Sequence, residues 1–213
     1  MFNSQAIPCD DQPISAGIMH ENRFLSSWIT PDSLEVQETY KELTEGISDP
    51  RERIYAVWRY VTDIPYTPYI NSRVQIDGKV IKQDDVWLDP AQALSFGCSL
   101  NCFNKSVLLA SLLRQDLSPD QVYVSLNNVT YDGIGGHAVV YLPNGDYILE
   151  STNPKITSPF MRASDVDMYE AVIFFNDNQV SAVPSAKLKE PLGLCCVEWL
   201  SSYCNHHLCD CYI

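Results

Sequence analysis

The chain has 213 residues, enough for one sizeable core, and 46% of them are hydrophobic, as in a folded globular protein. Its formal net charge of −13, with no cluster of basic residues, argues against binding to nucleic-acid phosphates or to anionic membrane surfaces. No stretch approaches the ~20 apolar residues of a membrane span, and the polar start Met-Phe-Asn-Ser-Gln lacks signal-peptide features, so we expect a cytoplasmic protein.

The first part of the chain is expected to support the core. Residues 1 to 30 show no clear periodicity and are interpreted as an irregular arm lying on the domain. Packing helices are predicted over residues 34–45 and from residue 50 to about residue 62, because each segment follows helix-start signals. The Asp77-Gly78 pair lies between two short apolar runs and predicts a small hairpin.

The segment from Gly97 to Arg114 predicts a buried helix with a cysteine at its start. Apolar residues cover almost its whole circumference, as expected for a helix that packs against a sheet. A thiol at a helix N-terminus lies in the positive field of the helix and beside backbone N–H groups without helical partners. Both effects favour thiol chemistry and make Cys102 the candidate nucleophile. Cys98 is interpreted as structural, with redox pairing with Cys102 as the alternative.

A hairpin downstream supplies a histidine and a carboxylate. Two alternating runs are joined by Asn144-Gly145, a strong short-range hairpin signal. If these residues form the turn, Val139 faces Glu150, and His137 shares a sheet face with Glu150 at a diagonal distance of about 7–8 Å. An isolated hairpin of this kind more often carries an ordinary half-buried histidine and a solvated glutamate. The upstream cysteine favours a site built from all three side chains.

The remaining segments predict strands and a cysteine-rich tail. A strand over about residues 122–126 precedes the hairpin, and strands over residues 170–175 and 179–183 follow it. The tail lacks a pair of Cys-x2-Cys knuckles, so we expect free thiols packed as small apolar residues, with zinc binding as the alternative. Its candidate ligands are Cys195, Cys196, Cys204, His206, His207, Cys209 and Cys211.

The cysteine, histidine and glutamate segments resemble the transglutaminase-like branch of the papain-like cysteine enzymes. The resemblance covers about residues 50 to 155, and residues 57–61 and 64–66 are similar to the family's leading helix and following strand. The matching residues downstream are Trp87, Pro90, Leu94, Gly97, Cys102, Leu112-Leu113-Arg114, Gly136-His137 and the run from Glu150 to Pro154. The resemblance implies an α+β, papain-like fold, in which the helix of Cys102 packs on an antiparallel sheet carrying His137 and Glu150.

The sequence departs from the family pattern near the site. The third member of the family's triad is usually Asp, whereas Glu150 is one methylene longer. One bacterial group binds calcium through acidic residues beside the cysteine, whereas Asn101 and Phe103 flank Cys102 here, so we carry over no calcium site and no other cofactor. Gln92 and Trp87 are noted as candidate oxyanion donors, because related enzymes use an upstream Gln or Trp.

The resemblance implies cysteine-dependent acyl transfer on an amide bond. Cys102 attacks the carbonyl, His137 takes and returns the proton, and Glu150 holds the imidazole in the useful tautomer. We prefer hydrolysis by a peptidase, isopeptidase or amidase, because the transglutaminase-like fold is far commoner than true cross-linking activity among the proteins that have it. The alternatives are a protein-glutamine gamma-glutamyltransferase and a non-catalytic papain-like scaffold with a metal- or partner-binding tail.

The expected organisation is one domain with two appendages. Residues 1–48 form an N-terminal arm and packing helix, residues 49–190 form the transglutaminase-like catalytic core, and residues 191–213 form the Cys/His-rich tail. The expected partner is a peptide or amide substrate, with no nucleic acid and no membrane. The sequence leaves the oligomeric state open.

Overall fold

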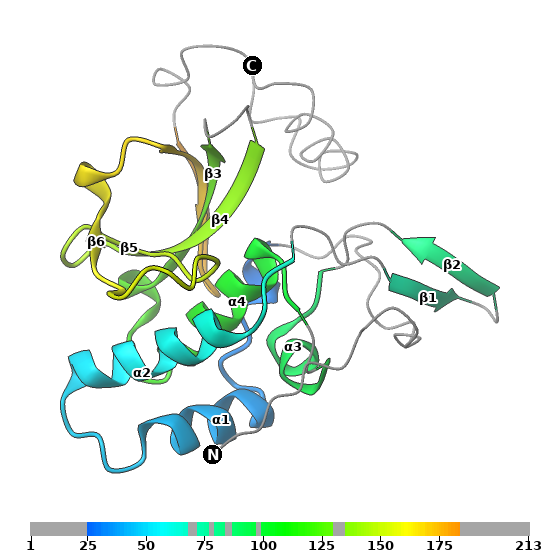
Figure 1. Cartoon of the computed structure of the whole chain (residues 1–213), viewed down its shortest axis with the longest axis horizontal. Helices are drawn as coiled ribbons and strands as arrows, with labels where there is room; N and C mark the ends of the chain where they lie inside the picture. Colours follow the sequence, from blue (N-terminus) through cyan, green and yellow to red (C-terminus); the bar gives the residue numbers. More distant parts are fainter. Residues whose placement is uncertain are drawn as a thin grey trace.

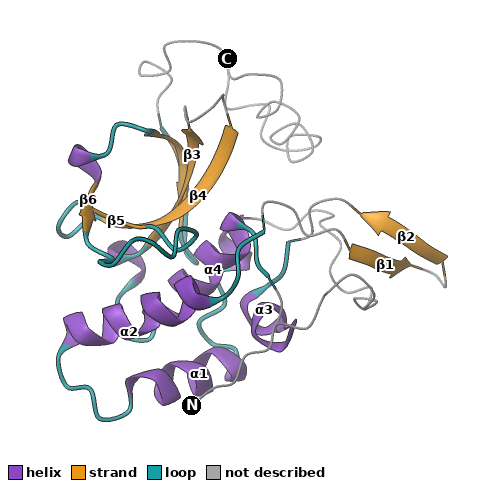
Figure 2. Cartoon of the chain, in the orientation of Figure 1, coloured by secondary structure: helices purple, strands orange, loops and turns teal. Residues whose placement is uncertain are grey.

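The computed structural model describes residues 25–67, 72–76, 79–83, 87–96, 99–129 and 135–183. Within these ranges the chain forms α-helices, a six-stranded sheet and a separate two-stranded sheet. The helices gather on one side of the larger sheet, and helices and strands occupy different parts of the molecule (Figures 1 and 2). The predicted α+β class is confirmed.

The larger sheet has the strand order β6-β5-β4-β3-β7-β8, and neighbouring strands are antiparallel. The strands predicted around residues 122–126, 170–175 and 179–183 are confirmed as β3, β7 and β8. The short β6 was not predicted, because two residues carry no periodic signal. The strands are β3 (Tyr123–Val129), β4 (Gly135–Leu142), β5 (Tyr147–Leu149), β6 (Met161–Arg162), β7 (Tyr169–Phe175) and β8 (Val180–Ala182).

The β4–β5 hairpin has the predicted register. Leu142 pairs with Tyr147 and Val140 pairs with Leu149. The same register, extended by one position, places Glu150 opposite Val139. The sequence therefore predicted correctly that Glu150 and His137 lie on one face of the sheet.

Helices α1 (Leu34–Thr44) and α2 (Pro50–Asp63) begin where the sequence predicts. The Ser33 side chain caps α1 by accepting a hydrogen bond from the backbone N–H of Val36, at 3.3 Å. Asp49 caps α2 by accepting from the backbone N–H of Arg51, at 2.8 Å, and Pro50 occupies the first helical position.

Helix α4 (Cys102–Leu113) lies at the centre of the core. Every residue of the helix after Cys102 is buried. It packs against β3 and β4 on one side and against α1, α2 and α3 (Pro90–Phe96) elsewhere. Helix α3 was not predicted from the sequence. The nearly uniform apolar surface of α4 is explained by these neighbours, which leave it almost no contact with water.

Aromatic rings from the segments before α1 and before α3 pack against the first turn of α4. Trp87 stacks on Phe103 with ring centroids 3.8 Å apart, and Trp28 meets both rings edge-on at 5.8 Å. The buried Asn104 side chain also accepts a hydrogen bond from the backbone N–H of Leu88, at 2.9 Å. The first turn of α4, which begins at Cys102, is therefore held in place by the segment that precedes α3.

The predicted small hairpin is confirmed as β1 (Ser72–Ile76) and β2 (Lys79–Gln83), which form their own sheet at the right of Figure 1. The strand expected after α2 is reduced to a single parallel bridge between Tyr66 and Leu100. None of the helices in the described ranges has the length and apolar character that a membrane crossing needs. The arm before residue 25, Cys98 and the cysteine-rich tail lie outside the described residues.

Candidate active site

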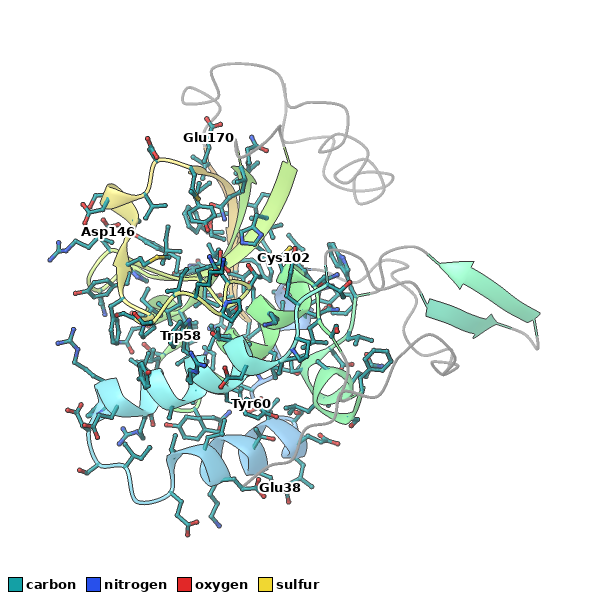
Figure 3. All side chains as sticks on the ribbon, viewed as in Figure 1. Glu38, Trp58, Tyr60, Cys102, Asp146 and Glu170 are labelled. Atoms are coloured by element: carbon teal, nitrogen blue, oxygen red, sulfur yellow. The ribbon has the colours of Figure 1, made fainter. Side chains whose placement is uncertain are left out.

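Cys102 is the first residue of α4 and is a partly exposed free cysteine. The Asn101 side chain caps the helix by accepting from the backbone N–H of Asn104, at 2.8 Å. The first helical hydrogen bond runs from the N–H of Lys105 to the carbonyl of Asn101, at 3.0 Å. The N–H groups of Cys102 and Phe103 thus precede the helical ladder, and the thiol lies in the positive field of the helix. Figure 3 labels Cys102 at this end of α4.

His137 lies on β4, opposite Asn127 of β3. Its Nε2 is 2.7 Å from Oε2 of Glu150, and its side chain is 15% exposed. The Cys102 side chain lies close enough to the imidazole to help raise the pKa of His137. Because Nε2 meets Glu150, Nδ1 is the nitrogen left for the thiol. One imidazole therefore connects the cysteine at the helix start with the carboxylate beyond β5.

The charges of these neighbours control the protonation of His137. Burial lowers the pKa of His137, but hydrogen bonds to Cys102 and Glu150 and their negative charges outweigh burial and raise it to about 10. The protonated imidazole is thus the favoured form at neutral pH. A protonated imidazole is therefore placed beside both the Cys102 thiol and the Glu150 carboxylate.

Glu150 follows β5 directly and is only 3% exposed. Its carboxylate accepts from the Tyr169 hydroxyl at 2.7 Å, in addition to its contact with His137. The backbone N–H and the hydroxyl of Thr152 both donate to it at 2.6 Å. Burial raises the pKa of Glu150, but the interactions with His137 and Thr152 dominate and lower it to about 2. The carboxylate is therefore ionised and firmly oriented.

Tyr169 is a residue of the site that the sequence analysis did not identify. It begins β7, and its ring stacks on the His137 imidazole with centroids 5.7 Å apart and planes 16° apart. It thus contacts both the imidazole and the carboxylate that orients it. Nothing in the sequence pattern pointed to Tyr169, because the contact depends on the pairing of β7 with β3.

The other candidates have different local roles. The amide oxygen of Gln92 accepts from the N–H of Asp89, and the Asp89 carboxylate accepts from the N–H of Gln92, both at 3.0 Å, so this pair caps α3. Trp87 packs in the aromatic cluster. Within the described part of the chain, no three His, Cys, Asp or Glu side chains group as a metal site requires.

Comparisons with known proteins identify the fold. No family model matches the sequence, and no curated protein matches it. An EGTA-treated form of LapG from Legionella pneumophila is similar in structure, with a TM-score of 0.53, 15% identity and coverage of 76% of this chain and 85% of that one. A second LapG structure from the same organism gives a TM-score of 0.51 and 16% identity, with coverage of 77% and 90%. The chain has a transglutaminase-like fold.

Proposed function

We propose that the chain is a cysteine-dependent hydrolase of amide bonds, a peptidase, isopeptidase or amidase. In this proposal Cys102 is the nucleophile, His137 the general base and acid, and Glu150 the group that orients the imidazole. The observation that carries the proposal is the His137 imidazole, which is hydrogen-bonded to the buried Glu150 carboxylate at 2.7 Å and lies close enough to Cys102, at the start of α4, for the cysteine to raise its pKa. The transglutaminase-like fold supports this use of the three residues.

The reaction begins when Cys102 attacks the carbonyl carbon of the bound amide. A sulfur–carbon bond forms, and the carbonyl oxygen takes on negative charge near the N-terminus of α4, where backbone N–H groups can stabilise it. The carbon–nitrogen bond then breaks, and the amine leaves with the proton held by His137. The product of this half is a thioester on Cys102.

Water completes the reaction. His137, now neutral, accepts a proton from a water molecule as the water attacks the thioester carbonyl. The carbon–sulfur bond breaks, the acid product leaves, and the thiolate–imidazolium pair is restored. Glu150 stays ionised throughout, and its hydrogen bonds to Tyr169 and Thr152 keep the imidazole aligned between the two steps.

A substrate screen with and without an amine tests the proposal. Purified protein is incubated with a peptide and amide library, first in buffer alone and then with a labelled primary amine. We expect release of amine from a subset of the library, with the acid as the main product. Transfer of the labelled amine as the main product would favour the transglutaminase alternative.

Two variants control the screen. The substitution Cys102→Ala should abolish turnover because it removes the nucleophile. An exposed substitution on the same fold, Lys41→Met in α1, should leave turnover unchanged. Turnover that survives in Cys102→Ala, or a library with no substrate at all, would count against a hydrolase acting through this cysteine.

A further inference from the structure

Lys105 is a lysine buried completely inside the apolar helix α4. Moving an ammonium group out of water costs several kcal/mol unless nearby groups compensate. A methionine would fill much the same space without that cost. Core packing alone therefore does not explain a lysine at this position, and its partners must account for it.

The ammonium of Lys105 holds the main chain next to Glu150. Nζ donates to the carbonyl of Ser151 at 2.8 Å and to the carbonyl of Thr62, near the end of α2, at 3.2 Å. The indole N–H of Trp58, which Figure 3 labels on α2, donates to the carbonyl of Glu150 at 2.7 Å. Two successive carbonyls, those of Glu150 and Ser151, are thus held by donors from two different helices.

The ammonium also lies in the field of two carboxylates. Burial lowers the pKa of Lys105, whereas the charges of Glu150 and Asp63 raise it, and the net result is about 8. The charged form therefore prevails at neutral pH. Asp63 is already paired with Arg59 at 2.7 Å, so Glu150 is the buried carboxylate that faces the ammonium. Glu150 is also hydrogen-bonded to His137, and His137 lies close to Cys102.

We propose that Lys105 is a positioning residue of the site, which acts on Cys102 and His137 through Glu150. Its hydrogen bond to Ser151 fixes the segment that carries Glu150, and its positive charge balances the negative charge of Glu150. This inference rests on the proposed function, because it assigns Lys105 a part in the same thiol chemistry.

The test measures alkylation of Cys102 by iodoacetamide between pH 5 and pH 9. The rate is followed by peptide mass spectrometry, with fragmentation that separates Cys102 from Cys98. Lys105→Met removes both the charge and the donors, whereas Lys105→Gln removes the charge and keeps N–H donors on a side chain one atom shorter. The matched control is Lys41→Met, which removes an exposed lysine of α1. Circular dichroism establishes that each variant is folded.

A missing positive charge makes the remaining groups of the site hold their protons more tightly. In Lys105→Met we therefore expect the pH of half-maximal alkylation to rise by about half a unit, the effect of a unit charge several ångströms away at high effective dielectric. The rate at pH 7 should also fall on the order of tenfold, because Glu150 and His137 lose alignment. Lys105→Gln should show the pH shift with a smaller loss of rate, and Lys41→Met should match the wild type.

The outcomes separate this inference from the proposed function. Fast alkylation of Cys102 in the wild type, together with an unchanged profile in a folded Lys105→Met or Lys105→Gln, would overturn the role of Lys105 and leave the proposed function standing. If Lys105→Met does not fold, the pH shift in Lys105→Gln decides alone. A wild-type Cys102 that reacts no faster than the other cysteines would overturn the proposed function and this inference with it.

Discussion

The Glu150 carboxylate is the most extensively bonded side chain of the site. It accepts four hydrogen bonds, from His137, from Tyr169 and from the backbone and hydroxyl of Thr152. A glutamate has one more rotatable bond than the aspartate usual in the family that the sequence resembles, and it would lose more side-chain entropy on being fixed. The donors from Tyr169 and Thr152 offset this cost, because they hold the carboxylate in one orientation.

The Tyr169 hydroxyl is expected to support turnover through its hydrogen bond to Glu150. Tyr169→Phe removes the hydroxyl that donates to Glu150 but keeps the ring stacked on His137. We expect turnover to fall on the order of tenfold, because His137 is less well aligned, while stability falls by only about 1 kcal/mol. Steady-state kinetics and thermal unfolding measure the two effects.

Tyr141→Phe is the matched control for Tyr169→Phe. It removes a similar bond from a tyrosine hydroxyl to the Asp146 carboxylate, at 3.1 Å, at the far end of the β4–β5 hairpin. It should change stability about as much and leave turnover unchanged. Equal losses of turnover in both variants would mean that Tyr169 supports the fold alone.

At the scale of secondary structure, the β4–β5 hairpin aligns the site. Its register places His137 and Glu150 on one face, and its turn requires glycine. Gly145 has a φ of 150°, and a Cβ added there would lie 2.3 Å from Cε2 of Tyr147. The backbone conformation of Gly145 in the turn thus helps to place His137 and Glu150 within hydrogen-bonding distance.

Gly145→Ala should weaken both the hairpin and the site. We expect a loss of stability of about 1–3 kcal/mol from backbone strain and the clash with Tyr147, measured by denaturant unfolding. Turnover should fall further than the loss of folded protein explains. Gly136→Ala serves as the control, because its φ is not strained and a Cβ there meets nothing within 4 Å. Equal stability of the two variants would contradict this account of the turn.

The sequence predicted the features of the fold that depend on residues adjacent to one another in the chain. The start of α2 was predictable because Asp49 and Pro50 are adjacent in sequence to the helix they begin. That His137 and Glu150 lie on one face of the sheet was predictable, because a two-residue turn determines which residues of β4 and β5 pair. The contact of Tyr169 with Glu150 was not, because it requires β7 to pair with β3 rather than with a nearer strand. Its partners are determined by sheet order, which a single sequence does not reveal.

The shifted pKa values of Glu150 and His137 make the stability of the whole molecule depend on pH. The pKa of Glu150 is lowered from 4.5 to about 2, so its contribution is complete above about pH 4.5 and is lost as the pH falls toward 2. The pKa of His137 is raised from 6.5 to about 10, so its contribution is complete below about pH 6.5 and is lost as the pH rises toward 10. Both contributions are complete only between about pH 4.5 and pH 6.5.

His137→Gln should remove the alkaline part of this dependence. We expect the melting temperature of the wild type to fall between pH 6.5 and pH 9 more steeply than that of the variant, because only the wild type loses the His137 contribution there. Between pH 4.5 and pH 2, the melting temperature of Glu150→Gln should likewise fall less steeply than that of the wild type. Melting curves measured at fixed ionic strength test both slopes. Parallel curves for wild type and variant on either side would refute the assignment for that residue.

The rate of thiol alkylation at pH 7 shows whether His137 activates Cys102. Wild-type protein and His137→Ala are treated with limiting iodoacetamide, and the modification of each cysteine is followed by mass spectrometry. We expect Cys102 to react on the order of tenfold or more faster than the other cysteines, and His137→Ala to remove that advantage. If all thiols in the wild type react at one slow rate, or if Cys102 stays fast in folded His137→Ala, the proposed activation of Cys102 by His137 is wrong.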